Sequence, residues 1–563
     1  MAQPPADTTI PPSPAVSDSR RMAVRAKSAA ARLAECSQSQ IDAIVGAVAA
    51  AAQARVESFA QLAVEETGFG VVADKIQKNR FAAERVYEFI KPMRTVGVIR
   101  RDDERKVVEI AEPFGVVAAI VPSTNPTSTA IYKILISLKA RCPIVISPHP
   151  SAARCITQVA ETLAEAAYAA GAPDGSVNWL TQASLEGTQE LMRHRDVAVI
   201  LATGGMGLVR AAYSAGKPAY GVGPGNAPCF IERSADLAKA ASDILTGKSF
   251  DNGVLCSSPN SVVVESAVAG ETRRQFQAQG GYFLSPAEVD IVSKALVTPQ
   301  RLPNPKFVGK SATYLAKAMG ITVPDGTRAL IAELGGVGRE FPLSIEKLCP
   351  VLSYYVVADW QEGCERCKQI LRYGGMGHTM SIHSKNEPVI LEFGLKKPAF
   401  RIVVNTPTTH GSIGLTTGLD PAMTLGCGGY GGNITSDNIT PMHLLNIKRL
   451  AYEIRPASTG RSTPPVALKA SLAPAPLPRV VSAPTEQGLS AASVTSHVEA
   501  FLGGRAGAGS VAEFVCESDV QEALEKGKTI LIGERTIITP LARDLGEAHK
   551  VLVSSAWPAP SHR

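Results

Sequence analysis

The amino-acid sequence predicts an α/β fold made of two doubly wound, parallel-sheet domains. From Phe114 onward, the apolar runs GVVAAIV, PIVIS, SVNWL and DVAVILA are each followed by a helix-like segment. A second alternating region extends from about Cys229 to Ala451. Alternating strands and helices form parallel sheets with helices on both faces. The chain has 563 residues, of which 45% are hydrophobic and 19% are charged, so it can build the large cores that two such domains require.

The first domain is expected to span residues 21–228. Residues 1–20 are Pro-rich, which predicts a disordered N-terminus. Apolar residues at helical spacing predict helices over about 38–66 and 71–92. The stretch TVGVIRRDDERKVVEIAEP places two β-rich runs around a charged turn, which predicts a hairpin over about 95–112. The four strand–helix units then complete this domain.

The rest of the chain is expected to form a second domain over residues 229–455, a linker and a tail. Residues 456–489 are Pro-rich, which predicts an extended linker. In the tail, residues 490–563, the stretch SVTSHVEAFLGG is typical of a helix, and Thr539 before Pro540 is typical of a capped helix start. A tail of this size is too small for a second enzyme, so we expect it to serve attachment or targeting.

Composition excludes several function classes. The net charge of +6 is spread thinly, and no block of like charges marks a nucleic-acid arm or a membrane-surface patch. We see no secretory signal and no apolar stretch of membrane-spanning length. The ten cysteines are too sparse for a disulfide framework, and the C-x-x-C of Cys364 and Cys367 lacks the further ligands of a zinc site. The protein is therefore expected to be cytoplasmic, without a metal, a nucleic-acid partner or a membrane partner.

Three turns follow strands of the first domain or lie shortly beyond them. In open α/β sheets ligands bind beyond the carboxyl ends of the strands, and turns of Gly, Pro and small polar residues can present backbone N–H groups there. Asn125, in the first turn, could alternatively serve only as a helix cap. The turns are Val121-Pro122-Ser123-Thr124-Asn125-Pro126, Thr203-Gly204-Gly205-Met206-Gly207 and Gly221-Val222-Gly223-Pro224-Gly225-Asn226.

Several long motifs, in order, carry a resemblance to a known family. They include PSTNPTSTAIYKILISLKARCPIVISPHPSA, ATGGMGLVRAAYSAGKPAYGVGPGNAP, FDNGVLCSS, LSIEKLCPVL, YGGMGHT and TPTTHGSIGLTTGLDPAMTLGCGGYGGN. Over about residues 22–452 the chain resembles the CoA-acylating branch of the aldehyde dehydrogenase superfamily. It is most similar to the acetaldehyde and propionaldehyde dehydrogenases of bacterial microcompartments, and to the aldehyde dehydrogenase half of bifunctional alcohol-forming enzymes. The resemblance implies an aldehyde dehydrogenase-like fold and an oligomerisation role for the hairpin, hence a homo-oligomer.

The resemblance also implies roles for individual residues. Cys256 matches the family's nucleophile, Asn125 its oxyanion-stabilising amide, and His378 a histidine near the active site, where imidazole can move a proton near pH 7. The cofactor is expected to contact Glu346, which matches the glutamate that holds the nicotinamide ribose, and further residues of the turns and strand ends: Pro122, Ser123, Thr124, His149, Thr203, Gly204, Gly205, Gly221, Val222 and Gly223.

These residues also have structural alternatives. Cys256 could be a small buried hydrophobe, because free cysteine is among the most buried residue types. Glu346 could be an exposed helix glutamate, and His378 a hydrogen-bonded core histidine.

The fate of a thioester on Cys256 depends on a missing carboxylate. Hydrolytic relatives carry a Glu-Leu-Gly-Gly stretch before the cysteine, and the matching place here is GVGPGNAP; no Asp or Glu occurs from Ala211 to Ile231. Without a base, water is a poor nucleophile, so acyl transfer to coenzyme A is expected. The expected function is thus reversible NAD-dependent oxidation of a short-chain aldehyde to its acyl-CoA. A hydrolytic dehydrogenase that releases the free acid and a binding protein without catalysis are the alternatives.

Two expectations rest on the resemblance alone. NAD is the expected cofactor, although His149-Pro150-Ser151-Ala152 stands where hydrolytic relatives have a glutamate that binds the adenosine ribose, so NADP is not excluded. The stretch GERTIITPLARDLGEAHKV is similar to segments that recur in microcompartment proteins. We therefore expect residues 490–563 to direct the enzyme to a microcompartment shell or to a partner enzyme inside it.

Overall fold

The computed structural model describes residues 12–455 and 512–554. The chain divides into two compact units between residues 458 and 459. The predicted linker, residues 456–489, and the predicted helix SVTSHVEAFLGG lie outside the described residues. Each unit is treated by itself below.

The first sheet of the large unit is parallel and has five strands in the order β5-β4-β3-β6-β7. All four apolar runs that predicted strands are strands of this sheet. Its strands are β3 (Val116–Val121), β4 (Ile144–Pro148), β5 (Val177–Trp179), β6 (Val197–Thr203) and β7 (Ala219–Val222). Its connecting helices are α6 (Pro126–Lys139), α7 (Ala153–Ala169), α8 (Leu185–Arg193) and α9 (Met206–Tyr213).

Helices cover both faces of this sheet, as the alternating side chains of β3 show. Val117 and Ala119 belong to one core with residues of α6 and α7. Ala118 and Ile120 belong to a separate core with residues of α8 and of the N-terminal helix α1 (Pro14–Ala34). Successive side chains of a strand point to opposite faces. Because both faces of β3 are buried, the sheet is doubly wound, as predicted.

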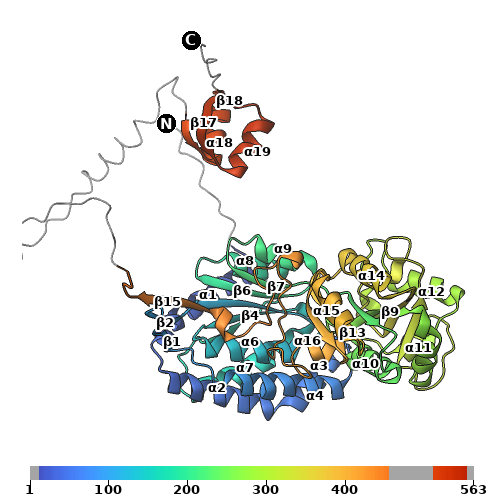
Figure 1. Ribbon diagram of the computed structural model, residues 1–563. Helices are drawn as coiled ribbons and strands as arrows, with labels where there is room; N and C mark the ends of the chain where they lie inside the picture. The colour runs from blue at the N-terminus through green and yellow to red at the C-terminus, as the bar shows by residue number, and fades with distance from the viewer. Residues whose placement is uncertain (1–11, 456–511, 555–563) are drawn as a thin grey trace, which may run out of the picture. The chain divides into compact units, whose positions relative to one another are not determined.

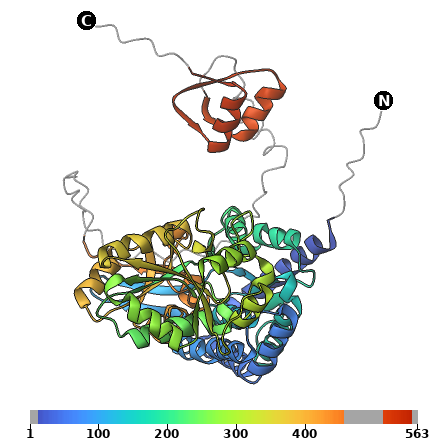
Figure 2. The ribbon, with the colours of Figure 1, turned by 90° about the vertical axis from the view of Figure 1, so that its right-hand side faces the viewer.

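The second sheet is also parallel and has seven strands in the order β10-β11-β12-β9-β8-β13-β14. Figure 2 brings its green and yellow helices in front. The strands are β8 (Ala227–Ile231), β9 (Pro259–Glu265), β10 (Gly281–Phe283), β11 (Ala329–Glu333), β12 (Val351–Val357), β13 (Gly377–His383) and β14 (Ala399–Val404). The helices are α10 (Leu237–Ser249), α11 (Ser266–Ala278), α12 (Pro286–Leu296), α13 (Ala312–Ala318), α14 (Trp360–Tyr373), α15 (Glu387–Leu395) and α16 (Thr408–Ser412).

A small antiparallel sheet joins the start and the end of the large unit. Strands β1 (Gly97–Asp102) and β2 (Val107–Pro113) form a hairpin over the stretch where one was predicted. The orange strand β15 (Leu445–Ala451) pairs with β2 on the other side (Figure 1). The segment before β15 packs in the core of the first sheet through Ile413, Leu425 and Ile439, among others. The second domain therefore does not extend to residue 455 as predicted, because the chain returns to the first domain.

The N-terminal prediction was wrong for residues 14–20, which begin the helix α1 (Pro14–Ala34). The Ser13 hydroxyl caps this helix and Pro14 occupies its first turn, so the proline marks a helix start rather than disorder. The carboxylate of buried Asp18 accepts hydrogen bonds from the backbone N–H groups of Thr181 and Gln182. Residues 1–11 lie outside the described residues.

The helices predicted over 38–66 and 71–92 are each divided in the structure. The first is α2 (Gln38–Gln53) followed by α3 (Val56–Thr67). The second consists of α4 (Val72–Arg80), a π-helical turn (Phe81–Arg85) and α5 (Val86–Ile90). In the described part of the chain no single helix meets the length and hydropathy of a membrane span; α2 and α3 meet them only as a pair bent by 61°.

The small unit alternates strands and helices within residues 512–554. Strands β16 (Ala512–Val515), β17 (Ile530–Ile538) and β18 (Leu552–Ser554) form a parallel sheet in this order. Helices α18 (Glu517–Glu525) and α19 (Pro540–Ala548) connect them. The Thr539 hydroxyl accepts a hydrogen bond from the Ala542 N–H, which confirms the predicted helix start.

Candidate active site

A cavity of about 420 Å³ lies at the carboxyl ends of β3, β4, β6 and β7. Most residues that the sequence predicted for the site line it, although they come from distant parts of the chain. Those that line it are Pro122, Ser123, Thr124, Asn125, His149, Thr203, Gly204, Gly205, Val222, Gly223, Cys256 and Glu346. Gly221 and His378 do not line it, and both are treated below.

Cys256 reaches this cavity from the turn between the short helix Phe250–Gly253 and β9. The residue as a whole is partly exposed, unlike the buried cysteines of the surrounding core such as Cys229 and Cys349. Burial of the sulfur, and next the neighbouring carboxyl of Glu346, raise the pKa of the Cys256 thiol to about 12. At neutral pH the resting side chain is therefore a thiol, which must lose its proton before it can act as a nucleophile.

The turn before Cys256 has an unusual backbone. Asp251, Asn252 and Gly253 have φ values of 50°, 54° and 72° in succession, all in the left-handed region. Asn and Asp tolerate this region better than other residues with a Cβ, and Gly adopts it freely. The sequence choice DNG thus allows a tight turn that delivers Cys256 to the cavity.

Asn125 precedes α6 but does not cap it with its side chain. Its Oδ1 accepts a hydrogen bond of 2.7 Å from Lys78 Nζ, and its Nδ2 donates to Thr124 Oγ1 at 3.2 Å. The capping role that was the structural alternative for Asn125 is therefore absent. The side-chain amide lines the same cavity as the Cys256 thiol.

Glu346 lies in a loop and not in a helix, so it is not the exposed helix glutamate that was its alternative. Its Oε1 accepts a hydrogen bond of 2.9 Å from the Gly225 N–H. Burial raises the pKa of the Glu346 carboxyl to about 8. It is the single acidic residue among the described residues that line the cavity, and at neutral pH it is mostly protonated.

His378 lies behind the cavity, at the start of β13, where its side chain is buried. Its Nδ1 is 2.9 Å from Thr379 Oγ1, and its Nε2 has no partner among the described residues. Burial, with a smaller effect of Arg401, lowers the pKa of His378 to about 3. The low pKa makes the neutral ring the resting form of His378 at pH 7, and its role in proton transfer stays a prediction.

Gly225 lies against three of the predicted site residues, Cys256, His378 and Glu346. Gly225 itself was predicted only as part of a turn. A Cβ on Gly225 would lie 2.0 Å from the Cys256 carbonyl oxygen and 3.3 Å from His378 Cγ. Its N–H also donates to Glu346. Only a residue without a side chain lets the GVGPGNAP stretch approach the Cys256 backbone so closely. Its place in a Gly-Pro-Gly turn was the available signal, but the contact with Cys256 is long-range and has no local pattern.

Comparison with known proteins agrees with this geometry. The sequence model of the aldehyde dehydrogenase family matches residues 10–280. The succinate-semialdehyde dehydrogenase (acetylating) of Clostridium kluyveri is 37% identical over 428 residues, which are 76% of this chain and 94% of that protein. The chain belongs to the acylating aldehyde dehydrogenases.

Two further relatives match similar shares of the chain. A crystal structure of an acetylating aldehyde dehydrogenase from Geobacillus thermoglucosidasius has 48% identity and a TM-score of 0.77, over 79% of this chain and 98% of that one. The bifunctional aldehyde-alcohol dehydrogenase of Escherichia coli is 43% identical over 442 residues, 77% of this chain and 49% of that protein. The chain thus spans about half the length of this bifunctional relative.

Two solved structures with lower identity carry informative descriptions. A propionaldehyde dehydrogenase of Rhodopseudomonas palustris, with bound CoA and an acylated cysteine, has 26% identity and a TM-score of 0.70, over 77% of this chain and 97% of that one. A propionaldehyde dehydrogenase from the fucose-utilisation microcompartment of Clostridium phytofermentans has 28% identity and a TM-score of 0.70, again over 77% and 97% of the two chains.

In this acylating aldehyde dehydrogenase, the turn after β6 has two features that suit a polar ligand. Thr203 Oγ1 is buried without a hydrogen-bond partner among the described residues, and a Cβ on Gly205 would meet nothing within 4 Å. An orphan polar atom and open space beside a glycine turn fit a bound polar ligand. Gly221 packs against α9, since a Cβ there would lie 2.8 Å from Val209 Cγ1, and its contact with a cofactor stays a prediction.

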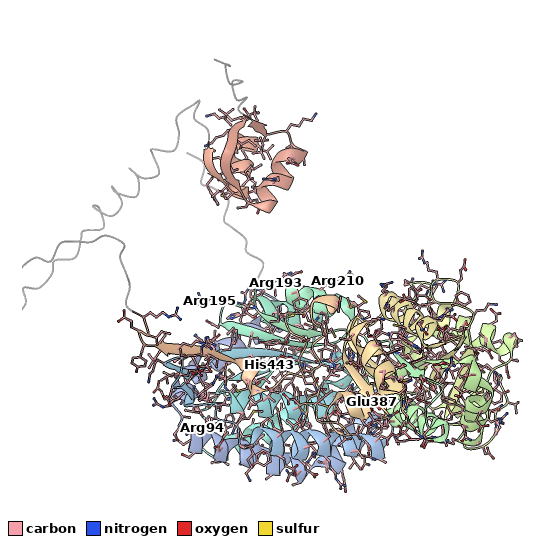
Figure 3. All side chains as sticks on the ribbon, viewed as in Figure 1. Arg94, Arg193, Arg195, Arg210, Glu387 and His443 are labelled. Carbon is pink, nitrogen blue, oxygen red and sulfur yellow. The ribbon has the colours of Figure 1, made fainter. Side chains whose placement is uncertain are left out.

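The described residues that line the cavity include no Lys or Arg. The exposed Arg193 and Arg195, labelled in Figure 3, lie just before β6 begins, at the end of that strand opposite to Thr203. A cofactor would thus be held by polar and backbone groups. Within residues 12–455 and 512–554, no group of three or more His, Cys, Asp or Glu side chains is placed to hold a metal ion.

Proposed function

We propose that this chain oxidises a short-chain aldehyde to its acyl-CoA with NAD as the oxidant, in a reversible reaction. The observation that carries the proposal is that Cys256 and Asn125 line one cavity whose described lining contains a single, largely protonated carboxyl group, Glu346. The balanced reaction joins aldehyde, NAD⁺ and CoA and yields acyl-CoA, NADH and one proton.

The chain's own residues supply the covalent step. The Cys256 thiolate attacks the aldehyde carbon and forms a C–S bond, and the carbonyl oxygen becomes an oxyanion. The Asn125 Nδ2 group donates to that oxyanion without changing its own charge. A bound NAD⁺ would supply the acceptor for the hydride of the same carbon, and loss of that hydride would leave a thioester on Cys256.

The thioester is proposed to pass to CoA because the site activates water poorly. Glu346 could in principle act as a base, but its raised pKa keeps it mostly protonated at pH 7 and one oxygen is engaged by the Gly225 N–H. The CoA thiol ionises far more readily than water, so its thiolate can attack the thioester without such a base, and the proton that it loses is regained by the released Cys256 sulfur. The CoA-bound, acylated structure of the Rhodopseudomonas palustris protein supports this order of events.

NAD is proposed over NADP, although the lining does not exclude either. Among the described residues that line the cavity, no carboxylate lies near His149 to repel a 2′-phosphate. The same lining contains no Lys or Arg that could bind such a phosphate. A solved relative that is 26% identical is an engineered glycolyl-CoA reductase with NADP⁺ bound. Comparison of kcat/KM for the two cofactors tests this point; a ratio above 10 in favour of NADP would overturn it.

The main experiment follows NADH with a C2 to C4 aldehyde, with and without CoA, in the wild type and in Cys256→Ala. The proposal expects sustained NADH formation only when CoA and Cys256 are both present. Sustained turnover without CoA, together with free acid as product, would instead identify a hydrolytic enzyme. No NADH under any condition would identify a binding protein.

We also propose two interactions with other proteins. The sheet of β1, β2 and β15 is proposed to be an oligomerisation arm that makes the enzyme a homo-oligomer, and residues 490–563 are proposed to bind a microcompartment shell or a partner enzyme. The microcompartment origin of the Clostridium phytofermentans relative supports the second proposal. Deletion of residues 456–563 should leave activity within about twofold, because none of the described residues that line the cavity belongs to the deleted part, but abolish co-purification with shell material. Loss of activity would contradict it.

A further inference from the structure

A cluster of buried charges lies between α4 and the turn before Cys256. The side chains of Lys75 and Lys78 are 2% exposed, and that of Asp251 is fully buried. Asp251 Oδ2 accepts from Lys75 Nζ at 2.9 Å and also from Lys78 Nζ. Buried ions are costly unless they are paired and hydrogen-bonded, so a function is a reasonable explanation for this cluster.

The cluster fixes the nucleophile turn through Asp251. Besides the two lysines, Asp251 Oδ1 accepts a hydrogen bond of 2.8 Å from the Val71 N–H. The Asp251 N–H in turn donates to Asp74 Oδ2 at 2.7 Å. These bonds hold a residue whose φ is 50°, a conformation that costs energy unless neighbours enforce it. Cys256 follows five residues later.

The same cluster fixes the amide of Asn125. Lys78 Nζ donates to Asn125 Oδ1 at 2.7 Å. An ammonium group can only donate, so it must face the oxygen of the amide and not its nitrogen. One N–H of Asn125 Nδ2 is used by Thr124 Oγ1, and the second remains for a ligand in the cavity. If the amide were flipped, it would present a carbonyl oxygen to an oxyanion and repel it.

We propose that Lys78 is a positioning residue that, with Asp251, holds the Asn125 amide in the one orientation able to donate to the oxyanion and couples it to the nucleophile turn. Lys78 does not line the cavity and so does not touch the substrate. The inference rests on the proposed function, in which Asn125 stabilises the oxyanion. It adds Lys78, on α4, as a positioning residue for the acylation step.

Lys75 provides a matched control. It is equally buried and pairs with the same carboxylate, but it contacts the Thr124 backbone carbonyl at 3.3 Å rather than the Asn125 side chain. Either Lys78→Met or Lys75→Met leaves Asp251 with one ammonium partner. The two variants therefore share the loss of a buried ion pair, and only Lys78→Met releases the Asn125 amide.

The test measures the NADH burst rate in a single turnover, with KM for NAD and the urea midpoint, for both methionine variants. Lys78→Met should lower the burst rate about 10- to 100-fold, part of the loss expected for a missing oxyanion donor, with KM for NAD within about threefold. Lys75→Met should lower the burst rate by no more than about threefold, although its loss of stability should be similar to that of Lys78→Met. Equal burst rates for the two variants would overturn the proposal.

A double mutant separates this proposal from the proposed function. In an Asn125→Ala background, Lys78→Met should change the burst rate by less than about threefold, because its partner is already absent. If Lys78→Met lowers the burst rate in that background by the same factor as in the wild type, the positioning role is overturned. If Asn125→Ala alone keeps the wild-type rate, the proposed function fails at Asn125 itself, independently of Lys78.

If Lys78→Met does not fold, Lys78→Gln and Lys75→Gln replace the methionine pair. A glutamine amide can accept as well as donate, so it no longer enforces one orientation of Asn125. Lys78→Gln should then have a burst rate about 3- to 10-fold below that of Lys75→Gln. Equal rates would overturn the proposal.

Discussion

The two sides of the cavity are built in different ways. The proposed cofactor side consists of turns at strand ends, with small uncharged residues such as Thr203, Gly204 and Gly205. The nucleophile side depends on a left-handed turn at Asp251 and Asn252, which the buried lysines of α4 hold in place. The groups proposed to bind the cofactor thus belong to turns whose backbone sets their position. The proposed reacting groups of Cys256 and Asn125 depend in addition on side-chain contacts that fix their orientation.

The largest expected effect is on the nucleophile side, at Cys256. Cys256→Ala should lower CoA-dependent NADH formation by about 1,000-fold or more, because Cys256 is the one cysteine among the described residues that line the cavity. Cys516→Ala, in the small unit, is the control and should keep wild-type activity. If Cys256→Ala kept an activity within about tenfold of the wild type, Cys256 would not be the nucleophile, and the comparison of the two sides of the cavity would lose its basis.

Asn125→Ala is expected to have the next largest effect. Removal of one oxyanion donor typically costs about 100- to 1,000-fold in kcat. The aldehyde KM should change little, because the charge on oxygen develops only during the reaction. A rise in KM with an unchanged kcat would show that Asn125 binds the substrate rather than the oxyanion.

Gly225→Ala tests the contact between the GVGPGNAP turn and Cys256. The new Cβ would lie 2.0 Å from the Cys256 carbonyl oxygen, so a backbone segment must move. We expect a loss of about 1–3 kcal/mol in the free energy of unfolding and a parallel loss of activity. At Gly207, on α9, a Cβ meets nothing within 4 Å, so Gly207→Ala should be neutral or slightly stabilising. Similar stability of the two variants would contradict the close packing.

The smallest predicted effect is electrostatic and depends on pH. The Cys256 pKa is about 12, so the rate of its alkylation by iodoacetamide should rise steadily between pH 7 and pH 10. The Glu346 carboxyl has a pKa of about 8 and is neutral below that value and negative above it. It therefore opposes the thiolate only at the higher pH values.

Glu346→Gln isolates this effect with little change in shape. Its alkylation rate should match the wild type below pH 7 and exceed it about 3- to 10-fold at pH 9.5. Mass spectrometry of the Cys256 peptide over the pH range gives both rates. A constant ratio across the range would show that Glu346 does not act on the thiol.

The sequence predicted the first side of the cavity better than the second. Strand-end turns such as Pro122–Asn125 follow apolar runs directly, and parallel strands bring such turns to one edge, so their meeting could be foreseen. Asp251 stood beside Cys256 in the sequence, yet its partners Lys75 and Lys78 lie more than 170 positions away. No local pattern encodes such a pairing. The return of residues 413–445 to the first core was missed for the same reason, since it depends on distant contacts. The helix at Pro14 was missed although Ser13 before Pro14 is a local start signal, because the Pro-rich composition around it predicts disorder.

The most direct test of the central claim measures NADH released from a known amount of enzyme with excess aldehyde and NAD but no CoA. The account predicts a burst of about one NADH per Cys256 site that then stops, because the acyl group waits for a thiol. Later addition of CoA should restart NADH formation and yield acyl-CoA. Steady NADH production without CoA, with the free acid accumulating, would contradict it.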